Sequence, residues 1–451
     1  MVRKYFHLAH HKTTVQGEVR AGITIFLTLS YILFLQPSIL SGQFANHPTG
    51  MDFGALLTAT CLASAIATFI MALYVKLPIA QAPGMGENFF FTNSLLPAGA
   101  AIAAANDWQV ALGAVFFTGL LFFLLVITGI AHRVIHAFSE SMRDALVGGI
   151  GLFITLIGFE NAGVIVKEAG LQLNPNLVSS PQTLVFFFGI VLGAILQVRK
   201  VKSFILWSIV GSFLMTIALH FIFPVKLDFS FPEAVVSLPP SIAPLFWKLD
   251  FVHAFSLKML PLILVLLVLS LFDATGSLMA VAQEAGYMRK GEHLAKARPA
   301  LLANSLSAMI GAIFGMSTVI SYTESLAGVE QGGRTGLTSF TVACLFLLAL
   351  FLYPVIQMIA SYPYITASAL VLVGAVMIKR IKEIEWMDYT EMLPSILVIF
   401  CIPFFFSIAD GVGIGLVAYP LIKLATGKWK QVNVLSVSLG LFFLLYFLFL
   451  Y

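Results

Sequence analysis

The stretch PGMGENFFFT, residues 83–92, decides how the rest of this chain is interpreted. It places two glycines, a proline, the carboxylate of Glu87 and the amide of Asn88 within six residues of an otherwise hydrophobic sequence. Backbone that cannot remain helical is tolerated at membrane depth only where it is buried in protein or lines a cavity. An ionisable group at that depth indicates a functional site. The stretch therefore predicts a broken membrane span beside a binding site.

A second interruption of the same kind lies far downstream, at residues 315–333 (GMSTVISYTESLAGVEQGG), and it carries Glu324. Two broken hydrophobic segments, one in each half of a chain, are typical of the binding site of a secondary transporter. The β-branched and hydroxyl residues before Glu324 favour a short extended piece. We expect residues 83–89 and 315–323 to be extended and to pair antiparallel across an inverted axis.

The composition identifies an integral membrane protein. Of the 451 residues, 59% are hydrophobic and 10% are charged, whereas soluble domains carry about a quarter charged residues. Apolar runs of about 20 residues predict helices rather than the alternating strands of a β-barrel. The net charge of +4 lies mostly in short loops, which argues against nucleic-acid binding. No motif for a metal, a cofactor or an enzyme reaction is present in the sequence, so we expect none of these.

The apolar runs predict an all-α polytopic fold with fourteen spans, arranged as a seven-plus-seven inverted repeat. Lys and Arg gather before the first span and after even-numbered spans, which places the amino terminus in the cytoplasm. Seven spans in each half then turn the second half upside down. Weak internal similarity agrees, because Gly84-Met85 matches Gly315-Met316 and Ala145-Leu146-Val147 matches Ala369-Leu370-Val371 in the same order. The third and tenth spans are the broken ones.

Asp273 lies in the middle of an apolar span, VLSLFDATGSLMAVAQ. A carboxylate at the centre of a membrane helix costs about 2.5–3.5 kcal/mol on insertion scales, so it needs a partner, a cavity or a function. Thr275, Gly276 and Ser277 follow it, and Gly276 would let a backbone or a flat ligand approach closely. The alternative is a structural hydrogen bond between helices.

The groups around the two interruptions suit a neutral, hydrogen-bonding solute. Glu324 can accept hydrogen bonds from a ligand's N–H groups and can bind a proton, while the amide of Asn88 offers both a donor and an acceptor. Phe89 could stack on a flat ring. Backbone amides near Gly84 and Gly86, together with Glu87, Ser317 and Thr318, would complete the site. These observations predict proton-coupled uptake, with Asp273 and Glu324 as the two candidate proton carriers.

Five motifs give the sequence a family resemblance. AGITIFLTLSYILFLQPSIL, APGMGENFFF, SLFDATGSLMAVAQEAG, SYTESLAGVEQGGRTGLTS and DYTEMLPSILVIFCIPFFFSIADGVGIG resemble the AzgA-like purine permeases of the nucleobase–cation symporter and ascorbate transporter superfamily. The resemblance implies transport of adenine, guanine or hypoxanthine, usually with protons, by motion of a core domain against a gate domain. It also implies substrate residues on the third, eighth and tenth spans, which correspond here to Gly86, Glu87 and Asn88, then Asp273, then Glu324. A homodimer is implied by analogy with the superfamily.

With the spans counted above, the resemblance implies a division of the chain into named parts. These are a cytoplasmic tail at 1–20, core-domain spans 1–4 at 21–131, gate-domain spans 5–7 at 143–223, an extracytoplasmic loop at 224–254, core-domain spans 8–11 at 257–359, gate-domain spans 12–14 at 364–425, and an apolar segment at 432–451 that is a further span or an outer helix.

The chain departs from the family pattern at the ligand. Family members usually carry Leu or Pro, then Asn-Ala, where this chain has Glu87, Asn88 and Phe89. Import of a purine base together with a proton across the inner or plasma membrane remains the principal hypothesis. Uracil, xanthine or another nucleobase are the alternative substrates. An anion exchanger of the same fold is disfavoured by two buried acids. An intramembrane enzyme built on Asp273 and Glu324 lacks a catalytic signature.

Overall fold

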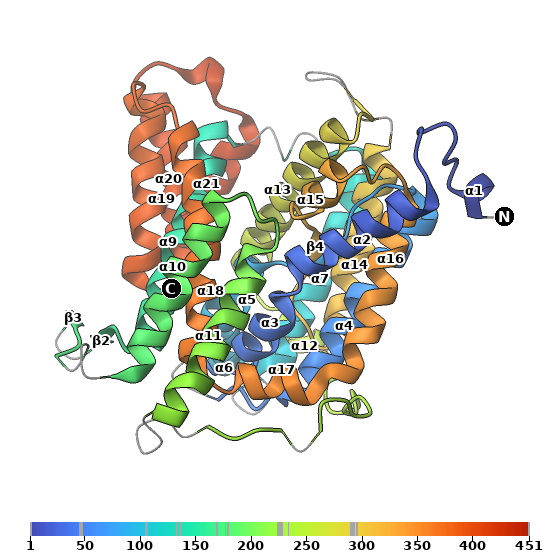
Figure 1. Ribbon diagram of the computed structural model, residues 1–451. Helices are drawn as coiled ribbons and strands as arrows, with labels where there is room; N and C mark the ends of the chain where they lie inside the picture. Colours follow the sequence, from blue (N-terminus) through green and yellow to red (C-terminus); the bar gives the residue numbers. More distant parts are fainter. Residues whose placement is uncertain are drawn as a thin grey trace.

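The computed structural model describes residues 2–44, 48–103, 107–131, 134, 138–167, 170–175, 177, 180–222, 229–232, 234–288, 294 and 296–449. Helices dominate this part of the chain (Figure 1). Ten of the described helical segments are long and apolar enough to cross a membrane, as expected for spans of about 20 residues. The protein is therefore a multi-pass membrane protein.

The helices that meet the length and hydropathy of a span run from one end of the chain to the other. They are α2 (Val15–Leu29) with α3 (Ile32–Leu40), α4 (Phe53–Ile70) with the π-helical turn Met71–Val75, α7 (Asp107–Thr128), α9 (Glu140–Asn161), α10 (Pro181–Val198), α11 (Phe204–Ile222), α13 (Leu260–Glu284), α16 (Gly336–Ala349) with α17 (Tyr353–Ala360), α18 (Pro363–Ile378) with its 3-10 extension Lys379–Glu383, and α20 (Ile408–Ala425).

Three further helices coincide with predicted apolar segments but are shorter. They are α14 (Ala297–Ile313), α19 (Tyr389–Phe405) and α21 (Val434–Phe449), with 17, 17 and 16 residues. The shortest described α-helices, α1 (Val2–Tyr5) and α12 (Phe251–Ala254), are single turns. Since ten helices qualify by length, the count of fourteen spans stays a prediction.

The two interruptions meet in a small sheet in the middle of the helices. Strand β1 (Gln81–Pro83) pairs antiparallel with β4 (Val319–Ser321), so the predicted pairing of the two segments is present. The predicted extent of the first segment is wrong, because residues 85–90 form the helix α5 (Met85–Phe90) instead of continuing as a strand. Met85 and Glu87 favour a helix once Gly84 has ended the strand, whereas Val319 and Ile320 are β-branched and hold β4 extended.

Each strand leads directly into a short helix. After β1, α5 passes into a π-helical turn (Phe91–Leu95) and then α6 (Leu96–Ile102). After β4, the chain forms α15 (Ser325–Glu330). A π-helical turn inside a helix is rare and frequently marks a functional site.

The helices pack in two groups. In one group α16 packs on α2 and α4, and α14 packs on α7 and α4. In the other group α9 packs on α18 and α19, α10 packs on α11 and α18, and α20 packs on α19 and α21. Figure 1 shows the second group on the left and the first on the right, with β4 and α5 between them.

The connections outside the helices include one feature that the sequence did not predict. A two-stranded hairpin, β2 (Ile165–Lys167) and β3 (Leu171–Leu173), follows α9. The predicted loop at 224–254 lies in part outside the described residues, at 224–228 and 233. Its described remainder is irregular up to α12 and is joined to the bundle by Ser237 N–H donating to Phe351 O and Trp247 N–H donating to Ile313 O.

Candidate functional site

The crossing of β1 and β4 brings the two interrupted segments together. Gln81 lies opposite Ser321, and Pro83 lies opposite Val319. The pairing continues past both ends, since Gly84 N–H donates to Thr318 O at 3.1 Å and Tyr322 N–H donates to Ala80 O at 3.0 Å. All six strand residues are buried. The site is therefore built on a rigid backbone framework, with α5 and α15 leaving it in turn.

Glu324 stands immediately before α15 and receives two hydroxyl hydrogen bonds. Tyr31 Oη donates to its Oε1 at 2.7 Å, and Thr323 Oγ1 donates to its Oε2 at 3.2 Å. The side chain of Glu324 is half-buried, whereas Tyr31 is buried at the junction of α2 and α3. Hydroxyl donors of this kind stabilise the ionised carboxylate, so Glu324 is prepared to act as a hydrogen-bond acceptor.

A polar contact joins the two interrupted segments. It is formed by Asn88, Ser317 and Thr318. Ser317 Oγ donates to Asn88 Oδ1. The hydroxyl of Thr318 accepts from Ser270 Oγ of α13 at 3.4 Å. Asn88 Nδ2 has only the Met85 sulfur at 3.9 Å, so the donor side of this amide remains available for a stronger acceptor.

Glu87 and Gly84 lie against one another at the start of α5. The side chain of Glu87 is 1% exposed, and neither carboxylate oxygen has a hydrogen-bond partner in the described part of the chain. Its own backbone N–H lies nearby without the geometry of a hydrogen bond. A Cβ built on Gly84 would lie 2.1 Å from Glu87 Oε2. Gly84 is thus required by close approach, whereas a Cβ on Gly86 would meet only Ile150 methyl groups at 3.5 Å.

Asp273 approaches the crossing from α13, which packs on both α5 and β4. Its side chain is half-buried. Tyr322, whose hydroxyl donates to the Pro83 carbonyl, lies within electrostatic reach of all three acids, Glu87, Asp273 and Glu324. All three carboxyl groups therefore act electrostatically on the same tyrosine at the crossing.

The neighbours of Asp273 on α13 are arranged differently from the expectation. Thr275 is half-buried, and its hydroxyl oxygen is buried without a partner among the described residues. Gly276 is exposed, and a Cβ built there would meet nothing within 4 Å. The structure thus places no close backbone against Gly276.

Phe89 packs between the two helix groups. Its ring is 1% exposed and lies edge-to-face against Phe153 of α9, with centroids 6.2 Å apart. Phe153 in turn packs edge-to-face on Phe406. In this conformation Phe89 contributes to the contact between α5 and α9.

Sequence reasoning missed three residues at the crossing and one buried amide on α3. The Tyr31 hydroxyl donates to the Glu324 carboxylate, and the Tyr322 hydroxyl donates to the Pro83 carbonyl of β1. The Ser270 hydroxyl donates to the hydroxyl of Thr318. Gln36 of α3 is fully buried, and neither its amide nitrogen nor its amide oxygen has a partner among the residues described. A glutamine beside Pro37 in an apolar span was the one available signal for this group.

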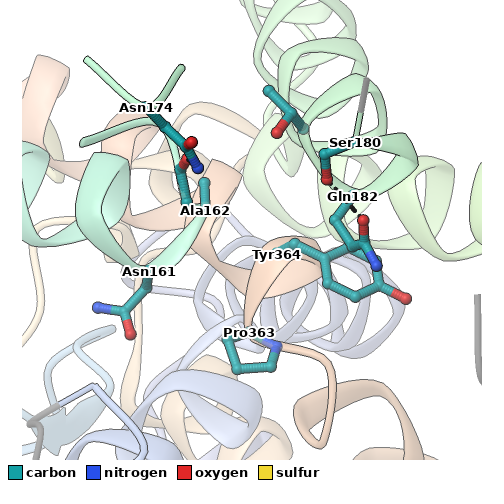
Figure 2. Close-up of a pocket in the computed structure, with 9 residues that line it drawn as sticks. Asn161, Ala162, Asn174, Ser180, Gln182, Pro363 and Tyr364 are labelled. Carbon is teal, nitrogen blue, oxygen red and sulfur yellow. Dashed lines mark hydrogen bonds between the residues drawn. The ribbon is translucent and has the colours of Figure 1, made fainter. Parts of the chain in front are cut away.

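A separate cavity of about 270 Å³ lies between the end of α9, the β2–β3 hairpin and the first turns of α10 and α18 (Figure 2). Its lining is neutral and polar. Asn161 Nδ2 donates to Ile157 O, and Asn174 Nδ2 donates to Gly163 O. No residue predicted from the sequence as a site residue lines this cavity.

Relatives with assigned names match the whole chain. Permease MJ0326 of Methanocaldococcus jannaschii is 42% identical over 449 residues, covering 100% of this chain and 98% of that protein. Guanine/hypoxanthine permease PbuG of Bacillus subtilis is 36% identical over 457 residues, covering 100% of both chains. Adenine permease AdeP of Escherichia coli is 34% identical over 450 residues, covering 100% of this chain and 96% of that one.

The fold is shared with a solved structure of low sequence identity. The transmembrane domain of the cyanobacterial bicarbonate transporter BicA superposes with a TM-score of 0.63 at 17% identity, covering 90% of this chain and 97% of that one. At this identity the likeness shows the fold alone.

The family model described as "Permease family" (Xan_ur_permease) matches residues 16–443. This match covers both interrupted segments and the helices of both groups, and it confirms the resemblance found in the five sequence motifs. The chain therefore belongs to the Permease family of nucleobase transporters, and it is a transporter rather than an enzyme.

Proposed function

We propose that this protein imports a purine nucleobase together with a proton, by alternating access, across the cell membrane. Two full-length relatives are named as permeases for guanine, hypoxanthine or adenine. The observation that carries the proposal is the β1–β4 crossing, where two broken spans bring Glu87, Asp273 and Glu324 around Tyr322. Carboxylates beside the backbone N–H groups at the start of a short helix suit a neutral base that offers ring N–H groups.

Glu324 is the principal ligand carboxylate in this proposal. Tyr31 and Thr323 fix its orientation, and a fixed acceptor binds a base with less loss of side-chain entropy. Asp273 is the second polar anchor, and the Asn88 amide with Ser317 and Thr318 supplies further polar contacts. Glu324 and Asp273 are both candidate proton carriers.

Alternating access would follow from motion between the two helix groups. Under the proposal, residues 21–131 and 257–359 form a core domain that carries the crossing, and residues 143–223 and 364–425 form a gate domain. The packing of α14 and α16 within one group and of α9 and α18 within the other supports this division. The amino terminus lies in the cytoplasm, and a homodimer is proposed by analogy with the superfamily.

Two other classes of substrate compete with a purine base, namely another nucleobase and an anion. Another nucleobase such as uracil or xanthine would use the same carboxylates, and Glu87 with Phe89 marks where the specificity could differ. BicA, which shares the fold, is named as a bicarbonate transporter. Three carboxyl groups at the crossing disfavour an anion for this chain, because like charges repel.

The test is uptake of labelled hypoxanthine into proteoliposomes, with and without an inward proton gradient. Excess adenine, guanine, uracil or xanthine serves as competitor. We expect gradient-driven uptake that purines compete and that Glu324→Gln abolishes. Glu140→Gln is the matched control, since the Glu140 side chain is 90% exposed at the start of α9. Competition by uracil alone would transfer the specificity to pyrimidines, and full activity of Glu324→Gln would exclude Glu324 as the ligand.

A further inference from the structure

Glu87 is treated unlike any other buried carboxylate in the described part of the chain. Three carboxylates there are buried, namely Glu18, Glu87 and Glu391. Glu18 accepts three hydrogen bonds, and Glu391 pairs with Lys423 at 2.7 Å. Glu87 has neither a donor nor a cation. An ionised carboxylate cannot be held in this way, because burial without compensation costs far more than the stability of a domain.

The two other acids at the crossing are better compensated than Glu87. Glu324 receives two hydroxyl hydrogen bonds. Asp273 is half-buried and lies within electrostatic reach of the Arg380 guanidinium. Of the three, Glu87 is therefore the one whose surroundings require the neutral acid.

Among the described residues, no donor or cation bonds the Glu87 carboxylate, and the helices packed on α5 are α3, α9 and α13. Of α9, Ile150 lies beside Gly86 and Phe153 packs on Phe89, and α13 carries Asp273. Beyond β4 stand Tyr322 and Glu324, and Asp273 is the charged group that acts on Glu87. A negative neighbour favours the protonated form of an acid.

We propose that Glu87, rather than Asp273 or Glu324, carries the proton that is coupled to transport. This inference rests on the proposed function and names the coupling residue of that same site. In the present conformation the carboxyl group is neutral and lies over Gly84. When the crossing opens to the cytoplasm, the Glu87 O–H bond breaks, its proton passes to water, and the base leaves unchanged. On the outer side a proton from water returns to the carboxylate, so one proton enters with each base.

The position of Glu87 suits a group that must become accessible in turn. It stands on the six-residue α5, between the strand β1 and the π-helical turn Phe91–Leu95. Both junctions are places where a helix changes direction readily. Since Gly84 has no side chain, the carboxyl group can lie over the backbone in one state and swing away in another.

The assignment also separates the roles of the three acids. A neutral Glu87 removes one negative charge from the crossing, which leaves Asp273 and Glu324 free to remain ionised acceptors for the ligand's N–H groups. Loss of the Glu87 proton would place a third negative charge beside them and weaken the binding of the base. Proton release and base release are thus linked through electrostatic repulsion.

The first experiment measures proton uptake on hypoxanthine binding to the purified protein in weakly buffered detergent, with pyranine as the pH indicator. Wild type, Glu87→Gln, Asp273→Asn and Glu324→Gln are compared, and binding is followed by calorimetry over a pH series. For wild type we expect no proton uptake at neutral pH, where Glu87 is already protonated. At alkaline pH, where the ligand-free carboxyl group has ionised, we expect uptake of up to one proton per base and an apparent Kd that rises by up to about tenfold per pH unit. Glu87→Gln should bind with a pH-independent Kd and take up no proton.

Two outcomes separate the failure of this inference from the failure of the proposed function. Wild-type behaviour of Glu87→Gln, or loss of proton uptake in an Asp273→Asn variant that still binds, would overturn the inference and leave nucleobase transport intact. Absence of nucleobase binding by the wild type, tested with all the competitors, would overturn the proposed function and this inference with it.

A second measurement needs no ligand and guards against poor folding of the variant. Infrared spectra of the ligand-free wild type at neutral pH should show the C=O stretch of a protonated carboxylic acid. This band should vanish in Glu87→Gln, shift in Glu87→Asp and persist in Glu140→Gln. A wild-type spectrum without the band at neutral pH would overturn the assignment.

Discussion

The β1–β4 crossing and the amino-terminal end of α16 each bury a carboxylate, and they treat it in opposite ways. At α16, Glu18 accepts from Arg334 N–H at 3.0 Å, Thr335 N–H at 3.1 Å and Thr338 Oγ1 at 2.5 Å. At the crossing, the Glu87 oxygens meet no donor among the residues described. A carboxylate saturated with donors holds helices together, whereas an unsaturated one is prepared to change its charge.

An ion pair between α19 and α20, in the second helix group, extends this comparison. Lys423 of α20 is 1% exposed, and its Nζ lies 2.7 Å from Glu391 Oε1 of α19 and 2.8 Å from Gln431 Oε1. Here the compensation is a cation rather than a set of N–H and O–H donors. Both compensated carboxylates are therefore structural. Variants at all three sites show whether the crossing differs from them.

The largest effect is expected at the buried ion pair. Lys423→Met leaves the Glu391 carboxylate buried without its cation, and breaking such a pair costs about 3–5 kcal/mol. Denaturant titration in detergent measures the loss. The double variant Lys423→Met/Glu391→Leu should recover most of it, because both charges are then removed. No recovery would mean that packing of the lysine stem, not charge, holds the site.

A smaller but still large loss is expected at α16. Glu18→Ala leaves two backbone N–H groups and the Thr338 hydroxyl without an acceptor, and each unsatisfied buried group costs about 1–3 kcal/mol. We expect a loss of about 3 kcal/mol in the free energy of unfolding. Glu140→Ala, on an exposed side chain, is the control and should change little. Equal effects of the two variants would contradict the structural role of Glu18.

Gly84 and Gly86 form a matched pair at the crossing. Gly84→Ala places a methyl group onto Glu87 Oε2, at 2.1 Å in the present arrangement. Overpacking of this kind costs about 1–3 kcal/mol, and uptake should fall with it. Gly86→Ala meets only methyl groups at 3.5 Å and should change the stability by about 0.5 kcal/mol or less. Thermal unfolding in detergent ranks the two variants, and a larger loss for Gly86→Ala would contradict the described packing.

Glu87→Gln should be nearly neutral for stability, in contrast to the variants of the compensated carboxylates. No hydrogen bond in the described structure is lost, and the amide matches a protonated acid in size. We expect the free energy of unfolding to change by less than about 1 kcal/mol, while proton coupling is lost. Destabilisation as severe as that of Glu18→Ala would place Glu87 among the structural carboxylates.

The smallest effect concerns a half-buried carboxylate at the start of α19. Lys428 Nζ donates to Asp388 Oδ2 at 2.6 Å and, with the Thr390 N–H and hydroxyl, lowers the pKa of Asp388 below its ordinary value. Since the pKa is lower in the folded chain, this contribution to stability is present above the ordinary pKa and is lost as the pH falls. The Tm difference between wild type and Asp388→Asn should therefore shrink on acidification. A gap that widens would contradict the assignment.

Much of the site could be predicted because polar residues in an apolar run are costly. Glu324, Asn88, Ser317 and Thr318 interrupt hydrophobic segments, and the structure brings them to one crossing. Tyr31 could not be found in this way, since a tyrosine in the run SYILF is compatible with simple packing. Its role becomes visible only when its hydroxyl reaches Glu324 across the fold.

In the fold, too, some features follow from sequence patterns and others depend on tertiary contacts. Apolar runs located the helices, because burial in lipid demands them. The strand β1 began earlier than expected, at Gln81, since neither Gln81 nor Ala82 has a β-branched side chain and pairing with Ile320 and Ser321 holds them extended. The β2–β3 hairpin was missed because its residues are few and largely exposed.

The contact between the β1 and β4 segments has a consequence for biosynthesis. Ala80 N–H donates to the hydroxyl of Ser325, a residue 245 positions later in the chain. At a synthesis rate of about 5–20 residues per second, the first half waits roughly 10–50 s in the membrane before its strand partner exists. Throughout that interval the Thr68 hydroxyl is a partner for the backbone of Gln81, but β1 lacks the backbone partners that β4 supplies, a condition that lipid tolerates poorly. We expect the nascent first half to depend on the insertion machinery, and the two halves expressed as separate chains to be degraded unless they are made together.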